Sequence, residues 1–556
     1  MEQARLFIAI ALSLLVFIIW NIFFVKKKVD QPPKQAQQKE QKTDNKSEIL
    51  KSEILKKEQI TVEKLPSMDK VPALPVKPSR TVTVKTPLYR VKISEKGAMF
   101  KSYVLNNYRK TIDADSPLLE MISPDISGGT IRLGLAGNSI DGLDDAIFSA
   151  DVEEDSVDIY DKSKEISFVW TSTQGVVLEK KFIFSPETYM VDLSVTIKNL
   201  SSKTLRDSLT LTLVREAEVK KNRYGFTGPS AIINNKLKQI KTKKIKDKNL
   251  YTGNIKWVAV QNRYFISAII PDEPIDAGMH LYMDNKTLQN RYVEAERVID
   301  SGAKHVFNYK LFFGPKSMKV LKSMDYDLVK AVHFGMFDII AKPCVWIMNF
   351  IYDHFIPNYG IAIIILTLFT KIILWPLGNK SYKSMAEMKK IQPLMAEIKE
   401  KYKDDKKRMN EEVMGLYKTY KVNPMGGCLP MFAQIPIFFA LYRMLYEAIE
   451  LRHAPFFWWI NDLSAPDRLF RFDVSIPFMQ PPYGIPVLTI IMGASMFIQQ
   501  KMSPPMGDAT QAKMMMLMPL VFTVLFINFS SGLVLYWLVN NIISMAQQYY
   551  IQKKKV

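Results

Sequence analysis

Long apolar runs without charge alternate with polar segments along the chain, and they predict its first elements. Leu6 to Val25 is 20 residues without a charge, which at about 1.5 Å per residue spans about 30 Å, one hydrocarbon core. Three lysines follow, and no small-x-small cleavage site does. We therefore predict an uncleaved transmembrane signal-anchor in residues 1–25 and not a cleaved signal peptide. Residues 26–80 are polar and lack aromatics, which predicts a disordered tether.

Between residues 81 and 316 the pattern changes to a period of two. Every second residue from Tyr189 to Ile197 is apolar, which is typical of a half-buried strand. Similar runs occur at Val82–Ile93, Ile166–Thr171, Val176–Phe184, Leu205–Val214, Trp257–Ile270 and His305–Phe313. So many strands at short spacing predict a large antiparallel β-sandwich over 81–316. The basic run Lys236–Lys248 lies between strands and fits either a solvated loop or a contact with anionic lipids.

Apolar runs return in the last part of the chain. Residues 317–355 predict a linker and an amphipathic helix, kinked at Pro343, that lies in the membrane interface. Residues 356–556 predict a helical core with five spans, at 360–377, 429–445, 484–498, 514–529 and 533–551. Several spans have only about 15 to 17 apolar residues, which predicts a locally thinned bilayer. With the signal-anchor, they make a polytopic α-helical membrane bundle of six spans.

Charge orients these spans. Residues 379–427 predict an antiparallel hairpin of two amphipathic helices, in which Asp405 can cap the second helix. The hairpin carries 12 Lys/Arg against 7 Asp/Glu, and the tail holds Lys553–Lys555, so both are predicted to be cytoplasmic. Six spans then place the N-terminus in the cytoplasm and the β domain outside, despite Lys26–Lys28. A cell inner membrane facing a periplasm fits this arrangement best.

The composition excludes several classes of function. Lys plus Arg is 75 and Asp plus Glu is 55, a formal charge of +20. The two cysteines, Cys344 and Cys428, exclude a disulfide scaffold and a cysteine-rich zinc module. Neither a His-Glu-x-x-His zinc motif nor a phosphate-binding loop occurs. We therefore expect no metal, no cofactor and no enzymatic activity.

One lysine lies deep enough in a predicted span to matter. Lys371 is eleven residues after Gly360, and an intramembrane charge costs at least about 2.5 kcal/mol. It either snorkels to the headgroups or supplies the positive charge of a hydrophilic groove open to the cytoplasm. Thr367 lies one turn before it, Gln434 lies near the cytoplasmic end of the next span, and Tyr536, Asn540, Ser544 and Gln547 form a polar stripe in the last span. The stripe alone fits interhelical hydrogen bonding, but stripe and lysine together favour the groove.

Several motifs resemble the YidC membrane protein insertase family. Residues 423–430 read NPMGGCLP, 434–438 read QIPIF, 500–504 read QKMSP and 531–537 read SGLVLYW. Residues 257–261 and 313–316, WVAVQ and FGPK, extend the likeness into the β domain. The resemblance covers nearly the whole chain.

This resemblance implies an insertase that inserts and folds nascent membrane proteins, alone or beside the Sec translocon, without nucleotide hydrolysis. It implies five core spans around a groove, a periplasmic supersandwich similar to sugar-mutarotase folds, and a hairpin and tail that contact the ribosome or targeting factors. By motif match and apolar character, the path for apolar client helices is assigned to Pro430, Ile435, Phe438, Met492 and Met496. Lys371 stands where the family usually has arginine, and Arg443 and residues 469–481 also depart from its pattern.

Two other readings compete with insertion. A small-anion transporter would use Lys371 as its binding charge, but the inverted repeats or broken paired spans typical of transporters are not evident. An intramembrane enzyme would need a nucleophile with its base, or metal ligands, within the spans. No His or Asp is placed for that role.

Overall fold

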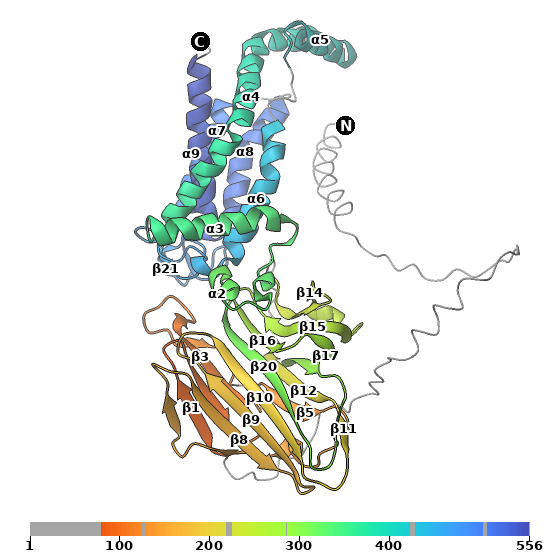
Figure 1. Cartoon of the computed structure of the whole chain (residues 1–556). Helices are drawn as coiled ribbons and strands as arrows, with labels where there is room; N and C mark the ends of the chain where they lie inside the picture. Colours follow the sequence, from red (N-terminus) through yellow and green to blue (C-terminus); the bar gives the residue numbers. More distant parts are fainter. Residues whose placement is uncertain are drawn as a thin grey trace, which may run out of the picture. The chain divides into compact units, whose positions relative to one another are not determined.

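The computed structural model describes residues 79–124, 126, 128–217, 225–284, 286–422, 429–503 and 509–554 (Figure 1). The predicted signal-anchor and almost all of the predicted tether lie outside these residues. The strands are β1 Thr81–Lys85, β2 Tyr89–Ser94, β3 Met99–Arg109, β4 Leu118–Glu120, β5 Arg132–Leu135, β6 Ser149–Ala150, β7 Ser156–Asp158, β8 Lys164–Thr171, β9 Val176–Phe184, β10 Met190–Asn199, β11 Leu205–Asp207, β12 Leu209–Glu216, β13 Gly228–Ile233, β14 Lys236–Gln239, β15 Leu250–Gln261, β16 Phe265–Pro271, β17 Ile275–Met283, β18 Thr287–Val293, β19 Arg297–Ile299, β20 Lys304–Pro315, β21 Leu469–Phe472 and β22 Tyr483–Ile485. The α-helices are α2 Met318–Ser323, α3 Asp338–His354, α4 Tyr359–Lys401, α5 Lys406–Thr419, α6 Leu429–Glu447, α7 Val487–Met502, α8 Ala509–Phe526 and α9 Ser531–Lys554.

Two large sheets and a short antiparallel pair, β11 with β19, form the described part of the β domain. Within the described residues, thirteen strands make the larger sheet, whose main path runs β5-β12-β18-β17-β15-β16-β20-β10-β9-β8-β6, with β13 and β14 attached through β15. The smaller sheet has the order β4-β3-β2-β1-β7. The recorded strand pairs are antiparallel except β1 with β7, which is parallel. The domain is therefore a large, almost wholly antiparallel sandwich, as the period of two predicts.

Aromatic side chains fill the space between the two sheets. Along β9, every second residue from Val176 to Phe184 is buried, so one face of the strand points into the core. Phe100 of the smaller sheet lies 5.2 Å from Phe182 and 5.8 Å from Phe313, measured between ring centroids. Both of these partners belong to the larger sheet, so the core lies between the sheets.

Several predicted strands are divided. The run Val82–Ile93 forms β1 and β2, because Thr86 Oγ1 accepts the backbone N–H groups of Leu88 and Tyr89 and closes a turn between them. The runs that begin at Leu205 and Trp257 likewise cover two strands each. The basic run Lys236–Lys248 is not a simple loop: its first four residues form β14, which pairs with β13.

Residues 317–355 contain less regular helix than predicted. The short helix α2 is followed by 3₁₀ turns at Leu328–Ala331 and Gly335–Phe337, and α3 then runs to His354. Pro343 lies inside α3, as expected. This helix buries Ala341, Val345 and Met348 and exposes Ile339 and Trp346, so it is amphipathic.

The helix α4 corrects the predicted boundary between the second span and the hairpin. It is one helix of 43 residues and continues through Pro376 and Pro393, where a span and a separate hairpin helix were expected. Asn358 caps its start by accepting the Ile361 N–H, and Asp405 caps α5 by accepting those of Lys407 and Arg408, as predicted. By length and hydropathy, α4 is the one candidate membrane span among the described residues, and Lys513–Phe526 is a shorter apolar helix. The count of six spans remains a prediction.

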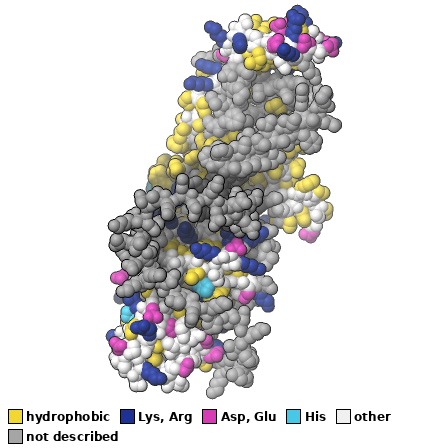
Figure 2. Space-filling model, turned by 90° about the vertical axis from the view of Figure 1, so that its right-hand side faces the viewer, with side chains coloured by type: hydrophobic (Ala, Val, Ile, Leu, Met, Phe, Trp, Pro, Cys, Tyr) yellow, Lys and Arg dark blue, Asp and Glu magenta, His cyan; other side chains and the backbone are white. Residues whose placement is uncertain are grey.

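The helices α4 and α6 to α9 pack together. α9 contacts α4, α6 and α7, and α7 also contacts α8. Gly493 allows α7 to approach α8 closely, since a Cβ there would collide with Thr523 Oγ1. Figure 2 shows hydrophobic side chains over these helices and charged ones at the tip that carries α5.

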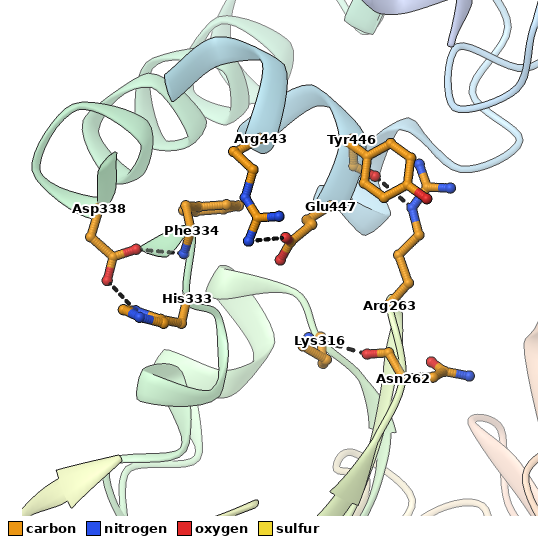
Figure 3. Close-up of polar contacts among 9 residues, drawn as sticks. All are labelled: Asn262, Arg263, Lys316, His333, Phe334, Asp338, Arg443, Tyr446 and Glu447. Atoms are coloured by element: carbon orange, nitrogen blue, oxygen red, sulfur yellow. Dashed lines mark hydrogen bonds and ion pairs between the residues drawn. The ribbon is translucent and has the colours of Figure 1, made fainter. Parts of the chain in front are cut away.

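A buried polar cluster joins the β domain to the end of α6 (Figure 3). The Lys316 ammonium donates to the Asn262 carbonyl at 3.2 Å, and burial lowers the pKa of Lys316 to about 8. Arg263 donates to the Tyr446 carbonyl at 2.6 Å, and its guanidinium lies 3.7 Å from the centre of the Tyr446 ring. Within α6, Arg443 pairs with the buried Glu447 at 3.0 Å. The contacts of Arg263 with Tyr446 link the turn between β15 and β16 to the end of α6.

Candidate functional site

A cavity of about 500 Å³ opens between α4, α6, α7, α8 and α9. Most of its lining is apolar, and polar side chains reach it from α4, α6, α7 and α9. Among its described lining residues, Lys371 is the one with a fixed charge. The described lining therefore combines apolar and polar side chains with one positively charged group.

Lys371 projects from α4 and is only 9% exposed. Its ammonium donates to Ser544 Oγ at 2.7 Å, and that hydroxyl donates in turn to the Asn540 carbonyl at 2.6 Å. None of the ion pairs recorded among the described residues includes Lys371. An ammonium held by a neutral hydroxyl keeps its charge uncompensated, so it can attract an anion that enters the cavity.

The polar stripe of α9 faces the same space. Gln434 of α6 donates to Asn540 Oδ1 at 3.0 Å, and Gln547 donates to Asn379 Oδ1 at 2.9 Å. Tyr536 lines the cavity one turn before Asn540. The structure thus brings together Lys371, Gln434, Tyr536 and Asn540, four of the five residues that the sequence assigned to the groove.

The fifth groove residue and part of the apolar path lie elsewhere. Thr367 is fully buried and donates to the Ile363 carbonyl of its own helix at 2.7 Å. Met492 is fully buried in the helix packing and does not line the cavity. The side chain of Pro430 lies outside the described side chains.

Three residues of the predicted apolar path do line the cavity. Ile435 and Phe438 reach it from α6, and Met496 reaches it from α7. The Phe438 ring meets the Trp537 ring edge to face, with 4.7 Å between their centroids. Together with Met518 and Phe522 of α8, they make up much of the apolar lining of the cavity.

Sequence reasoning missed several polar residues of the cavity. Gln499, Gln500 and Ser503 at the end of α7 line it, as do Ser381 and Tyr382 of α4. Asn541 of α9 also lines it and donates to Ser495 Oγ at 3.0 Å. The adjacent glutamines that end an apolar helix were a usable signal, since polar residues at such a depth need partners.

The lining limits what the cavity can do. Its described lining residues include no carboxylate and no histidine. Within the parts of the chain that the structure describes, no group of three or more His, Cys, Asp or Glu could hold a metal ion. The cavity offers hydrogen-bonding groups to a polar chain, apolar side chains for contact, and one positive charge that can attract an anion.

Two family models match almost all of the part of the chain that follows the predicted tether. Residues 81–347 match the YidC periplasmic domain, and residues 350–556 match the 60Kd inner membrane protein. A membrane protein insertase YidC from Syntrophus aciditrophicus is 39% identical and covers 98% of this chain and 99% of its own. Another, from Syntrophobacter fumaroxidans, is 40% identical and covers 99% and 100%.

Solved structures include a crystal structure described as an active YidC insertase with the first transmembrane domain resolved. It is 20% identical to this chain, with a TM-score of 0.37, and the match covers 86% of this chain and 95% of that one.

Proposed function

Because the chain belongs to the family of YidC membrane protein insertases, we propose that it inserts and folds membrane proteins in the inner membrane, alone or beside the Sec translocon. Nascent membrane proteins are its clients. The chain itself hydrolyses no nucleotide, since the burial of the client's apolar helix in lipid drives the step.

The proposed topology has six spans, with both termini in the cytoplasm and the β domain in the periplasm. The excess of basic residues in 379–427 and at Lys553–Lys555 supports this orientation. In this arrangement α4 runs without a break from the second span into the cytoplasmic hairpin, so one helix connects the groove to the hairpin. The proposed domains are the anchor 1–25, the tether 26–80, the β domain 81–316, the linker and interfacial helix 317–355 and the core 356–556.

The cavity is the proposed groove through which the polar flank of a client enters the membrane. Moving an unpaired polar chain into hydrocarbon costs several kcal/mol for each buried group, in the range of about 2 to 7. Asn540, Gln434 and the other amides offer hydrogen bonds that replace part of the lost hydration. A locally thin bilayer, predicted from the short spans, shortens the rest of the barrier.

Lys371 is the proposed attracting charge of this groove. The observation that carries the proposal is its ammonium, nearly buried and bonded to a neutral hydroxyl inside a cavity that holds no described carboxylate. An acidic residue in the client's tail supplies the missing counter-charge. Ile435, Phe438 and Met496 give the client's apolar helix a wall along which to leave for the lipid.

The hairpin tip is the proposed contact for the ribosome or targeting factors and for anionic lipids. Most described side chains of α5 are exposed, and the helix carries Lys407, Arg408 and Lys418. Arg and Lys on an exposed helix suit the phosphates of ribosomal RNA or of lipid headgroups.

Substitutions of Lys371 test the proposed mechanism. Lys371→Arg keeps the charge and should insert clients normally, while Lys371→Ala and Lys371→Glu should impair insertion, most for clients with acidic tails. The alanine variant loses about 1 kcal/mol of attraction between Lys371 and an acidic client tail. Its insertion of such a client should therefore fall about fivefold. The measurement is complementation together with an insertion assay at matched protein level.

Lys380→Glu is the matched control, since Lys380 lies on the same helix but is exposed and does not line the cavity. It should insert an acidic-tailed client normally. Normal insertion of that client by Lys371→Glu would remove Lys371 from the mechanism, and a silent Lys371→Ala would favour the snorkelling interpretation.

A further inference from the structure

The loop between α6 and α7, residues 448–486, exposes unusually large apolar side chains. We call it the outer loop. Trp458 is 88% exposed, Phe470 is 72% exposed and Phe478 is 82% exposed. A single exposed apolar residue is common on any protein, but three large aromatic ones in one loop indicate a surface that meets something other than water.

Hydrogen bonds hold the outer loop in place, so the exposure of its three aromatic side chains does not result from a loosely held loop. Asn528, in the turn between α8 and α9, donates to the Phe478 carbonyl at 2.7 Å and accepts the Gln480 N–H at 2.8 Å. Arg468 donates to the Pro482 carbonyl at 3.0 Å. The strands β21 and β22 pair antiparallel across the loop. Backbone groups of the loop are hydrogen-bonded to other parts of the protein, while the three aromatic rings are exposed.

The same loop is bonded to the starts of two core helices, α7 and α9. Asp467 accepts the Leu488 N–H at 2.8 Å and the Thr489 hydroxyl at 2.9 Å, which caps the start of α7. The N–H groups of Ser531 and Gly532 at the start of α9 donate to loop carbonyls at 2.7 and 2.9 Å. The loop therefore lies at one end of the helices, where Figure 1 shows β21.

The exposed apolar surface of α8 leads directly to this loop. Leu520, Val521 and Leu525 are more than half exposed, and Leu525 lies three residues before Asn528. If α8 spans the membrane as proposed, this surface faces lipid, and the loop lies where that surface ends. Around Phe478, from Phe472 to Ile485, the loop carries one charged residue, Asp473, whereas Arg468 and Arg471 lie beside Phe470. Aromatic side chains with few charges at the end of a span are typical of the membrane–water interface.

We propose that the outer loop anchors in the outer leaflet of the bilayer, with Trp458, Phe470 and Phe478 at the level of the lipid headgroups and upper acyl chains. This inference rests on the proposed transmembrane arrangement. Because the loop is bonded to α7, to α9 and to the turn after α8, its anchoring fixes the depth of three helices that line the groove. The loop thus sets how far the groove reaches into the bilayer.

Fluorescence quenching by lipids tests this anchoring in the full-length protein. Cys344 and Cys428 are replaced by serine, single cysteines are introduced by Phe478→Cys, Leu520→Cys and Tyr160→Cys, and each is labelled with an environment-sensitive nitrobenzoxadiazole dye. The proteins are reconstituted in vesicles of phosphatidylethanolamine and phosphatidylglycerol that contain doxyl lipids, with the quencher near the headgroup or deep in the chain. Tyr160 is an exposed residue of the β domain and serves as the aqueous control.

We expect the dye at position 478 to be quenched severalfold more by the shallow quencher than by the deep one. The dye at position 520 should show the reverse order, and the dye at position 160 should not be quenched. If 520 is quenched while 478 behaves like 160, the loop does not enter lipid and the inference fails, although the proposed spans stand. If neither 478 nor 520 is quenched, the proposed spanning arrangement fails as well.

Discussion

Lys180 of β9 offers a prediction whose magnitude follows from the structure. Its side chain is fully buried between the two sheets, and its ammonium donates to the carbonyls of Gly97, Ala98 and Ile131 at 3.2, 2.6 and 3.1 Å. Ala98 and Ile131 have φ values of 45° and 59°, in the left-handed region that costs a non-glycine residue about 1 to 3 kcal/mol. The ammonium holds this strained backbone in place.

Burial lowers the pKa of Lys180 from 10.5 to about 7. At about 1.4 kcal/mol per pH unit, this difference is worth roughly 5 kcal/mol. Below about pH 7, Lys180 is protonated in both the folded and the unfolded chain. The whole cost of burying its charge then opposes folding. Between about 7 and 10.5 the unfolded chain holds the proton and the folded chain does not, so the free energy of unfolding rises with pH.

The variant Lys180→Met removes this dependence and keeps an unbranched side chain of similar length. The wild-type free energy of unfolding minus that of the variant should therefore grow by about 3 to 4 kcal/mol between about pH 7 and 10. Guanidinium titrations of the full-length protein in detergent, followed by circular dichroism of the β domain, measure this difference.

Lys181→Met is the matched control, because Lys181 is the next residue of the strand but points outward and pairs with Glu165 at 2.7 Å. Its difference from wild type should not grow with pH in this window. Parallel curves for wild type and Lys180→Met would show that the pKa of Lys180 is not lowered, and would refute the reasoning.

Two further predictions concern packing. Glu447→Ala should remove the carboxylate that pairs with Arg443 and lower the stability of the detergent-solubilised protein by about 1 to 3 kcal/mol, seen as a lower Tm; an unchanged Tm would mean that the pair contributes nothing. Gly493→Ala should push α7 away from α8 and lower the Tm, and Thr523→Ala in the same chain should recover most of that loss, because it removes the hydroxyl that the new Cβ meets. A Gly493→Ala variant as stable as wild type would contradict the close approach.

Local periodicity predicted much of this fold because burial repeats with the geometry of each element. In β9 the inward positions are Leu178, Lys180 and Phe182, so the period of two also placed a lysine on the buried face. The carbonyls that receive it come from the turn before β3 and from the segment before β5, 49 to 83 residues away. No local pattern specifies such partners.

The candidate site was predictable where helical spacing alone was enough. Lys371 and the stripe from Tyr536 to Gln547 follow from spacings of three and four, and they meet because α4 packs on α9. The end of α4 was not predictable in this way: the apolar run ends at Leu377 and a charged segment follows, which predicted two helices where the structure has one that continues to Lys401. Thr367 lies on the expected face, yet its hydroxyl is satisfied by its own helix.

The most direct test of the central claim, that clients pass through the groove, is site-specific photo-crosslinking at two neighbouring residues of α4. Leu374 lines the cavity, whereas Ile373 is 60% exposed and does not line it. A photoreactive amino acid at position 374 should trap a nascent membrane protein stalled during insertion, and the same amino acid at position 373, at nearly the same depth, should trap much less. Equal or stronger trapping from position 373 would contradict passage through the groove.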